Sequence, residues 1–318
     1  MTLKVSNSCV NVIFALMYNP KRPKIIKNIP LISPKALMLI FISFITIICI
    51  DNQAFSQGYK IKTIVIDAGH GGKDGATRGA FSTEKEVALK TALNLGKLIE
   101  TEMPDVRVVY TRTSDVFVPL YDRIGVANEA KADLFISIHC NDMPLRRSTV
   151  TTGYRKLKSG KRVPITKTVY RKSTSTRGTE TFVSGMGRMN EQDEVIKREN
   201  AAILLEENYQ ENYQGFDPNN PENYIILSLM KNNFREASLN FAKMVQNEYV
   251  KVGRIDRGVQ EKSLAVLARA GMPAILTEIG FISNPEEEEY MNSEFGQTEI
   301  TRGLFNAIST YKKTVEHN

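Results

Sequence analysis

The chain contains little histidine and little cysteine, with three of each among 318 residues. It also lacks an uncharged apolar run of the roughly 18 to 20 residues that cross a bilayer as a helix, since the longest such run covers residues 36–50. His317 lies in a polar C-terminal tail, which leaves His70 and His139 as candidate metal ligands. The sequence therefore excludes a metal site built from three histidines.

Residues 1–56 differ in character from the rest of the chain. Five Lys and Arg residues lie between positions 21 and 35, ahead of the apolar run, and Ala54-Phe55-Ser56 follows it. A basic flank, a short apolar stretch and a small-residue exit are typical of a secretory signal peptide. The alternative is an uncleaved membrane anchor. We expect a signal peptide and leader, export to the periplasm or cell envelope, and no integral membrane domain after cleavage.

Cleavage near Ser56 would remove Cys9 and Cys49 and leave Cys140 as the one cysteine, which excludes an intrachain disulfide. A domain of about 260 residues buries enough apolar surface to fold without one. Cys140 directly follows His139, and successive residues of a strand point to opposite faces. We therefore expect Cys140 to be a buried small side chain rather than a thiolate ligand or nucleophile.

From residue 62 onward, apolar runs typical of strands alternate with patterns typical of helices. This alternation predicts an α/β fold with an open, mostly parallel twisted sheet and helices on both faces. We expect a single catalytic domain over residues 62–315. The expected strands are 63–67, 106–110, 133–138, 179–183 and 274–279. The first expected helix begins with a capping box formed by Thr83 and Glu86. The other expected helices are 120–130, 221–249 and 297–312.

Two insertions interrupt this alternation. The first, residues 143–179, carries eleven Lys and Arg and no acidic residue. Its portion from Tyr154 to Lys172 is typical of a β-hairpin turning at Ser159-Gly160. It is either a solvated excursion or an electrostatic contact with an anionic polymer or surface. No nucleic-acid partner is expected for an exported chain without a stacking motif. The second, residues 191–223, is typical of a surface helix followed by a loop at 215–221.

Each candidate histidine follows an apolar run that ends at a tight polar turn. In open α/β sheets ligands bind beyond the carboxyl ends of the strands, so His70 and His139 can converge on one metal ion. A catalytic zinc commonly has three protein ligands, and the third must then be a carboxylate. Glu84 is the best candidate, although an acid in the first turn of a helix also complements the helix dipole. Asp67 and Asp74 are also near His70 in the sequence, and we expect Asp67 to be hydrogen-bonded within the turn.

A metal hydrolase also needs a base, and Glu278 stands at the exit of the apolar run 274–277. An acidic residue there is costly unless it is paired or functional. The alternative interpretation is a carboxylate that caps a helix or pairs with an arginine.

These residues resemble the zinc-dependent N-acetylmuramoyl-L-alanine amidases, the cell-wall amidases with a type-3 catalytic domain. The resemblance runs from about Thr63 to Tyr311, broken by the two insertions. It rests on five ordered motifs: Ile66-Asp67-Ala68-Gly69-His70-Gly71-Gly72, Glu84-Lys85-Glu86-Val87 with Leu89, Thr111-Arg112 with Leu120-Tyr121-Asp122-Arg123 and Ala127-Asn128, Ser137-Ile138-His139, and Glu278-Ile279-Gly280-Phe281-Ile282-Ser283-Asn284.

The resemblance implies that His70, Glu84 and His139 hold zinc and that Glu278 is the catalytic acid and base. The implied reaction is hydrolysis, by zinc-activated water, of the amide between N-acetylmuramic acid and the L-alanine of the stem peptide in peptidoglycan. Arg112, Arg123 and Asn141 are candidates for substrate binding, or structural residues that tie loops together. The sequence departs from the family at Cys140, where a small residue such as Ala is usual.

In division-associated members of this family, an insertion carries a helix that covers the zinc until an activator protein displaces it. Residues 191–223 occupy a comparable place, and Arg198-Glu199-Asn200 opens their apolar segment. We expect Glu199, or failing it Glu206 or Glu207, to occupy the open zinc position in a resting form. The alternative is a wall of the substrate groove.

Two rival functions remain open from sequence. A wall-binding protein without catalysis would lack one of the four site residues, and all four are present. A zinc carboxypeptidase acting on stem peptides would differ in the bond that it cleaves.

Overall fold

The computed structural model describes residues 59–75, 77–185, 194–213 and 233–317. Residues 58–318 form one compact unit. The expected signal peptide and leader, residues 1–56, lie outside the described residues. Within the described ranges, no helix has both the length and the apolar character needed to cross a membrane.

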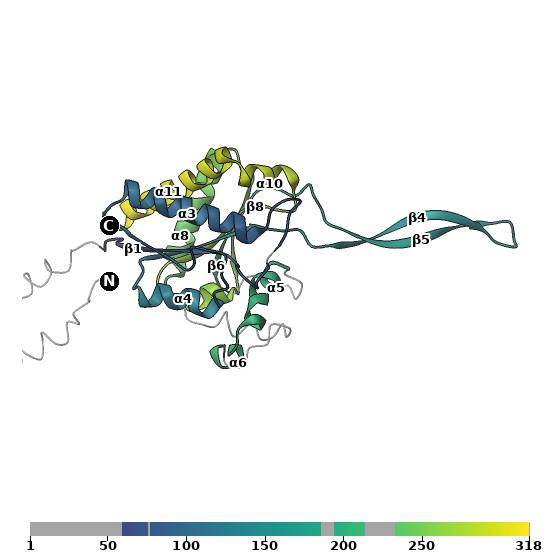
Figure 1. Cartoon of the computed structure of the whole chain (residues 1–318). Helices are drawn as coiled ribbons and strands as arrows, with labels where there is room; N and C mark the ends of the chain where they lie inside the picture. The colour runs from purple at the N-terminus through teal and green to yellow at the C-terminus, as the bar shows by residue number, and fades with distance from the viewer. Residues whose placement is uncertain (1–58, 76, 186–193, 214–232, 318) are drawn as a thin grey trace, which may run out of the picture. The chain divides into compact units, whose positions relative to one another are not determined.

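A six-stranded, mostly parallel sheet forms the centre of the compact unit (Figure 1). Its order is β2-β1-β3-β8-β6-β7, and the one antiparallel pair is β6 with β8. The strands are β1 (Thr63–Ala68), β2 (Arg107–Tyr110), β3 (Leu134–Asn141), β6 (Thr179–Ser184), β7 (Asp256–Lys262) and β8 (Ala274–Phe281). The expected strands are present, but β3 continues to Asn141, so His139 lies within the strand rather than in a turn after it. The strand β7 is one that the sequence patterns did not predict.

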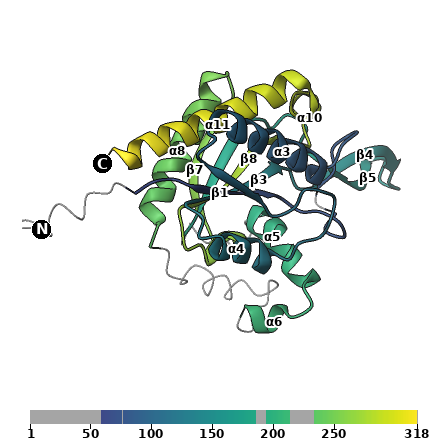
Figure 2. The ribbon, with the colours of Figure 1, turned by 60° about the vertical axis from the view of Figure 1, so that its left-hand side comes forward.

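Helices cover both faces of the sheet, which confirms the predicted fold class (Figure 2). One face carries α3 (Glu84–Glu102), α8 (Arg235–Lys251), α10 (Pro285–Asn292) and α11 (Glu294–Glu316). The other carries α4 (Leu120–Glu129) and α9 (Ala265–Ala268). The expected helix at 221–249 corresponds to α8, and much of the first half of that range lies outside the described residues.

The two faces of the sheet bury two separate cores. Because side chains alternate along a strand, β3 supplies Ile136 to the first core and Phe135 to the second. Cys140 is fully buried in the first core, as predicted.

The first insertion forms the expected hairpin. Strands β4 (Arg146–Lys156) and β5 (Arg162–Arg171) make a separate two-stranded antiparallel sheet. Its first strand begins eight residues earlier than the segment starting at Tyr154 that the sequence indicated. Nearly every residue of the two strands is exposed.

The second insertion is more deeply packed than the sequence indicated. It forms α5 (Glu194–Asn200), the 3-10 helix η2 (Ala201–Leu205) and α6 (Tyr209–Asn212). The prediction of a surface helix is wrong for its centre, because Ile203 is fully buried in the core that also contains α4 and α9. Asn200 fixes this packing: its side chain donates to the carbonyl of Ser263 and accepts from the backbone N–H of Ala265. The expected loop at 215–221 lies outside the described residues.

The carboxylate of Asp67, near the end of β1, joins three other elements. It accepts hydrogen bonds from Ser137 of β3 (2.6 Å), from Thr111 after β2 (2.6 Å) and from Nη1 of Arg123 in α4 (2.8 Å). The side chains of Asp67 and Arg123 are almost completely buried. Burial alone would raise the pKa of Asp67, but Arg123 and the two hydroxyl donors hold it below the ordinary value of 3.8.

We expect Asp67→Asn to lower the free energy of unfolding by about 3 kcal/mol, because it leaves the Arg123 guanidinium buried without a counter-charge. The folded pKa lies below the unfolded one, so this stabilisation is present above about pH 4 and is lost as the pH falls through the folded pKa. Denaturant titrations between pH 3 and 7 measure both effects. Asp105→Asn, at an exposed surface ion pair, should change stability by less than about 1 kcal/mol. Equal losses in the two variants would contradict the assignment.

Candidate metal centre

His70 lies in the turn after β1 with an unusual backbone conformation. Its φ is 57°, and Gly71 and Gly72 follow with φ of 125° and 55°. A side chain in this left-handed region is uncommon and is retained where the surroundings impose it. Arg123 helps to impose it by donating to the His70 carbonyl (2.6 Å). On the ring, Nδ1 lies 2.8 Å from Asp74 Oδ2, which leaves Nε2 to face the centre of the site.

Glu84 is the first residue of α3, as the capping box predicted. One carboxylate oxygen, Oε2, accepts from the hydroxyl of Thr77 (2.7 Å). The other, Oε1, accepts from the backbone N–H of Cys140 (3.0 Å) and lies 3.2 Å from both His70 Nε2 and His139 Nδ1. The carboxylate is therefore held in place by α3, the preceding loop and β3.

Glu288 of α10 holds the loop that leads into Glu84. Its carboxylate accepts from the backbone N–H groups of Ala80 (2.7 Å), Phe81 (2.9 Å) and Ser82 (2.7 Å). Burial would raise the pKa of Glu288, but these donors lower it. No pattern in the sequence indicates this contact, which joins residues more than 200 positions apart.

His139 is near the end of β3, and its ring passes directly over Gly69. A Cβ at position 69 would lie 2.5 Å from Cε1 and Nε2 of His139. Only glycine leaves room for the ring there. The imidazoles of His70 and His139 meet edge to face with their centroids 4.8 Å apart.

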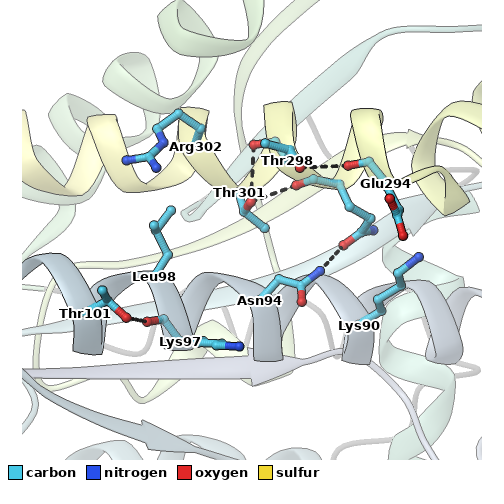
Figure 3. A pocket seen from close by; sticks show the side chains of 10 residues that line it. Lys90, Asn94, Lys97, Leu98, Thr101, Glu294, Thr298, Thr301 and Arg302 are labelled. Carbon is cyan, nitrogen blue, oxygen red and sulfur yellow. Dashed lines mark hydrogen bonds between the residues drawn. The ribbon is translucent and has the colours of Figure 1, made fainter.

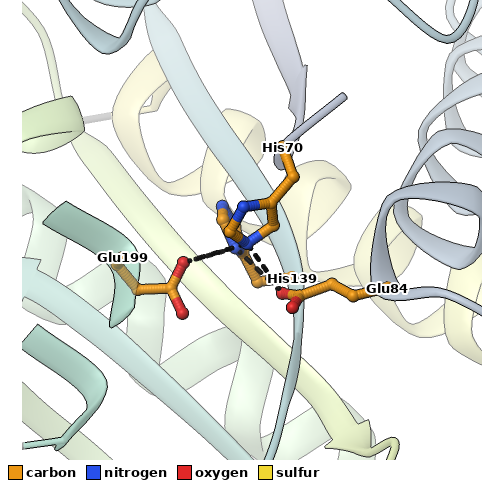
Figure 4. Close-up of side chains that lie close together, drawn as sticks. All are labelled: His70, Glu84, His139 and Glu199. Carbon is orange, nitrogen blue, oxygen red and sulfur yellow. Dashed lines mark hydrogen bonds and ion pairs between the residues drawn. The ribbon is translucent and has the colours of Figure 1, made fainter. Parts of the chain in front are cut away.

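Glu199 of α5 completes a group of four side chains (Figure 4). Its Oε2 lies 2.8 Å from His139 Nδ1 and 3.3 Å from His70 Nε2. One nitrogen or oxygen from each of His70, Glu84, His139 and Glu199 lies within 4.8 Å of the others, and all four residues are buried. The structure thus brings together the three predicted zinc ligands and the residue predicted to cover the metal.

The arrangement of these atoms fits a cation. Among the described residues, His70 Nε2 and Glu199 Oε2 have no hydrogen-bond partner of suitable geometry despite their short separation. Two imidazole nitrogens and two carboxylate oxygens are a donor set that suits zinc.

The electrostatics also call for positive charge at this point. Burial would lower the pKa of His139, but Glu199 and Glu84 raise it to about 9. Burial likewise opposes the rise in the pKa of His70, which Glu84 chiefly causes. Conversely, the pKa values of Glu84 and Glu199 are lowered by the histidines, again against burial. Two buried carboxylates thus favour positive charge at this point, which a bound metal ion would supply.

Glu278 lies beside this group because β8 pairs with β3. His139 and Glu278 are direct partners across the two parallel strands. Glu278 is fully buried, and its Oε2 has no hydrogen-bond partner among the described residues. Burial raises its pKa to about 8, with Arg198 opposing the rise. A buried carboxyl with a pKa near neutrality is suited to accept and return a proton.

Arg198 connects the second insertion to this carboxyl. Its guanidinium donates to Glu199 Oε1 (2.7 Å) and lies 3.2 Å from Glu278 Oε1 and from Asn141 Oδ1. The sequence indicates Arg198 only as a residue that opens an apolar segment, and these contacts were not foreseen. An insertion has no strand or helix register that would indicate where it packs.

The three candidate substrate-binding residues have different surroundings. Arg112 is buried and donates to the carbonyls of Ala68, Gly69 and Lys85, and Arg123 binds Asp67 and the turn after β1. These contacts favour the structural alternative for both arginines.

Asn141 lies beside Arg198 at the edge of the centre. The role of all three residues in substrate binding stays a prediction.

The two other glutamates considered for covering the metal are not among the four clustered side chains. Glu206 accepts from the backbone N–H of Leu120 (2.8 Å) and from the hydroxyl of Tyr213 (3.0 Å). Glu207 is exposed. Of the three candidates, Glu199 is the one placed at the centre.

A surface groove of about 540 Å³ runs between α3 and α11, and it contains none of these residues (Figure 3). Lys90, Lys97 and Arg302 contribute positive charge to its lining. Polar contacts join the two helices there, such as Asn94 with Gln297 (3.0 Å). The groove is a seam between packed helices rather than part of the metal centre.

Comparison with known proteins identifies the family. The family model described as N-acetylmuramoyl-L-alanine amidase matches residues 64–310. The chain belongs to this amidase family. It is 27% identical over 250 residues to the amidase AmiC of Escherichia coli, in an alignment that covers 78% of this chain and 52% of AmiC. The chain thus spans about half the length of that relative.

Solved structures of amidases share the fold. The catalytic domain of CwlV from Bacillus (Paenibacillus) polymyxa superposes with a TM-score of 0.53 at 25% identity, over 80% of this chain and 99% of that domain. The amidase of Clostridium difficile 630 gives a TM-score of 0.54 at 24% identity over the same shares. The mostly parallel sheet is therefore the fold of the amidase family.

Asp74 orients His70, so we expect Asp74→Asn to weaken the binding of a divalent metal by about 10- to 100-fold while the fold is kept. Competition between the purified protein and a colorimetric zinc chelator measures this affinity. Asp122→Asn, at an exposed carboxylate on α4, is the matched control and should leave the affinity unchanged. Equal affinity in wild type and Asp74→Asn would contradict an orienting role.

Proposed function

We propose that the chain is an exported, zinc-dependent N-acetylmuramoyl-L-alanine amidase that cleaves peptidoglycan. One observation carries the proposal: a buried group of two histidines and a glutamate lies beside the buried carboxyl of Glu278, inside the span matched by the amidase family. The bond cleaved is the amide between N-acetylmuramic acid and the L-alanine of the stem peptide. The names of relatives such as the amidase AmiC support this substrate.

His70, Glu84 and His139 would hold the metal. When bound, zinc polarises a carbonyl and lowers the pKa of water, which is the chemistry that amide hydrolysis needs. The protein fixes these ligands through Asp74 on one histidine and Thr77 on the glutamate. Such supporting contacts hold the ligands ready for the ion before it arrives.

Glu278 would accept a proton from the attacking water and deliver it to the leaving amine. Its position within β8 places it next to His139 on the neighbouring strand. Because burial raises the pKa of this carboxyl to about 8, it can both take up and release a proton near neutral pH. Peptidoglycan lies outside the cytoplasm, in keeping with the expected signal peptide.

We expect Glu278→Gln to lower the rate of peptidoglycan hydrolysis by about 10²- to 10⁴-fold and to keep bound zinc, because the amide cannot carry the proton. Mass spectrometry of the digest should show free stem peptides that begin with L-alanine, from wild type only. Glu289→Gln, an exposed glutamate on α10, is the control for loss of charge.

New amino groups at another position of the stem peptide would identify a carboxypeptidase or endopeptidase instead. Binding of peptidoglycan without any product, with zinc bound and Glu199 removed, would identify a wall-binding protein.

Glu199 would hold the enzyme in a resting form. Its carboxylate lies against both histidines and would take the metal position that the substrate needs. In the same helix, Arg198 engages the catalytic carboxyl of Glu278. Displacement of α5 by an activator protein would open the site. The alternative, in which α5 forms a wall of the substrate groove, predicts the opposite effect of removing Glu199.

We expect Glu199→Ala to raise the basal rate of hydrolysis roughly 10-fold, because substrate no longer competes with the carboxylate. Rates on purified peptidoglycan and zinc content measured together test this. Glu207→Ala, at an exposed glutamate beyond η2, is the control. A lower rate with zinc lost would make Glu199 an ordinary ligand, and a lower rate with zinc retained would favour the groove wall.

A further inference from the structure

The charge of the compact unit is divided unevenly between the β4–β5 hairpin and the remainder. Residues 146–172 contain ten Lys and Arg and no Asp or Glu. The other residues from 58 to 318 contain 26 basic and 34 acidic residues, a net charge of −8. The hairpin therefore carries all the excess positive charge of the unit, on a segment that is attached to an acidic domain.

Nothing in the described part of the chain covers the hairpin. Its strands pair only with each other, and its residues are exposed with the exception of a few half-buried positions such as Val150, Val163 and Val169. Figures 1 and 2 show no other labelled element along its length. A two-stranded hairpin alone is at best marginally stable in water. A ribbon of this length gains stability if a surface covers it.

The hairpin changes composition along its length. The half next to the domain, residues 146–152 and 166–172, contains five exposed threonines and has its basic residues mainly at the base. The outer half, residues 153–165, is here called the distal end. It combines five basic residues, Arg155, Lys156, Lys158, Lys161 and Arg162, with the apolar residues Tyr154, Leu157, Val163, Pro164 and Ile165.

The strand register distributes both kinds of side chain over both faces of the distal end. Tyr154 pairs with Pro164, and Lys156 pairs with Arg162 on the same face. The Arg162 guanidinium lies over the Tyr154 ring at 5.3 Å, which confirms that these two share a face. Ile165 lies on the opposite face. Large apolar side chains remain in water there: Tyr154 is 58% exposed, Ile165 48% and Leu157, at the turn, 39%.

We propose that the distal end docks onto the surface of an anionic phospholipid bilayer. Lys and Arg near such a surface are attracted to its anionic headgroups, and apolar side chains that enter the interface add to the binding. A soluble anionic polymer would bind the charged side chains but would not bury the exposed Leu157 and Ile165. A folded acidic protein presents one face, whereas the distal end carries charged and apolar groups on two faces and at the turn. A bilayer interface surrounds an inserted tip, so it can contact the charged groups and bury the apolar groups on both faces.

The half next to the domain then acts as a spacer. Seven residues of extended chain span about 23 Å. The spacer would keep the acidic domain away from anionic headgroups while the tip is bound. Docking involves no residue of the metal centre, so it is independent of the proposed amidase activity.

Co-sedimentation of residues 58–318 with phospholipid vesicles tests the proposal. We expect binding to vesicles of phosphatidylcholine with about one third phosphatidylglycerol, and none to phosphatidylcholine alone. Lys158→Glu with Lys161→Glu should weaken binding at least ~10-fold, since two attractions become repulsions. Leu157→Ser should weaken it about fivefold without a change in charge. Circular dichroism and thermal unfolding check that each variant is folded, so the test does not depend on the proposed activity.

Lys243→Glu with Lys313→Glu is the matched control, because both lysines are exposed on the helical body and the net charge changes equally. This variant should bind as wild type does. Equal weakening in the control would show attraction by net charge alone and overturn the proposal. Unchanged affinity in Leu157→Ser, together with competition by soluble polyglutamate, would point to a polymeric acid rather than a bilayer. Absence of binding to anionic vesicles by wild type would overturn it outright.

Discussion

The buried carboxylate of Asp67 is the interaction on which the geometry of the metal centre depends. It joins β1 to β3 through Ser137 and to α4 through Arg123, and the same arginine donates to the carbonyl of His70. The left-handed conformation of His70 is thereby tied to the packing of the sheet. A ligand on a rigid element is held more accurately than one on a free loop.

Next to these contacts, the site places several negatively charged side chains close together in the protein interior. Glu84, Glu199 and Glu278 are all buried, and the described residues supply Arg198 and the two histidines to balance them. Burying carboxylates is costly unless they are paired, which explains why each of them contacts a cationic group. A metal ion held by this group would complete the balance without protonating the histidines.

Much of the metal centre could be predicted from the sequence, because its residues lie near the carboxyl ends of strands that the sequence indicates. The contacts made by loops and insertions could not be predicted, because no regular strand or helix spacing fixes where such segments pack. His70 and Glu278 lie at the ends of apolar runs, and parallel strands bring such positions to one edge of a sheet. The role of Glu84 as a metal ligand was ambiguous from its spacing alone, because an acid in the first turn of a helix also complements the helix dipole. Only the resemblance to the amidase family strengthened the assignment. Arg198 reaches Glu278 from an insertion, and Glu288 fixes a loop from 206 to 208 positions away.

The strand β7 and the apolar run 201–205 show two ways in which the sequence patterns were misjudged. The strand β7 was missed because charged residues interrupt its alternation. The apolar run 201–205 was a usable signal: it indicated burial, and Ile203 is in the core.

The adjacency of Arg198 and Glu199 has a consequence for how such a site can respond. Both side chains leave one turn of α5, and one contacts the histidines while the other contacts the acid of β8. A rigid-body displacement of this helix would therefore separate both contacts together. Asn200 hydrogen-bonds to the backbone of Ser263 and Ala265, and these hydrogen bonds would have to break before the helix could move. The displacement proposed to uncover the metal position would thus also free the carboxyl of Glu278 from Arg198.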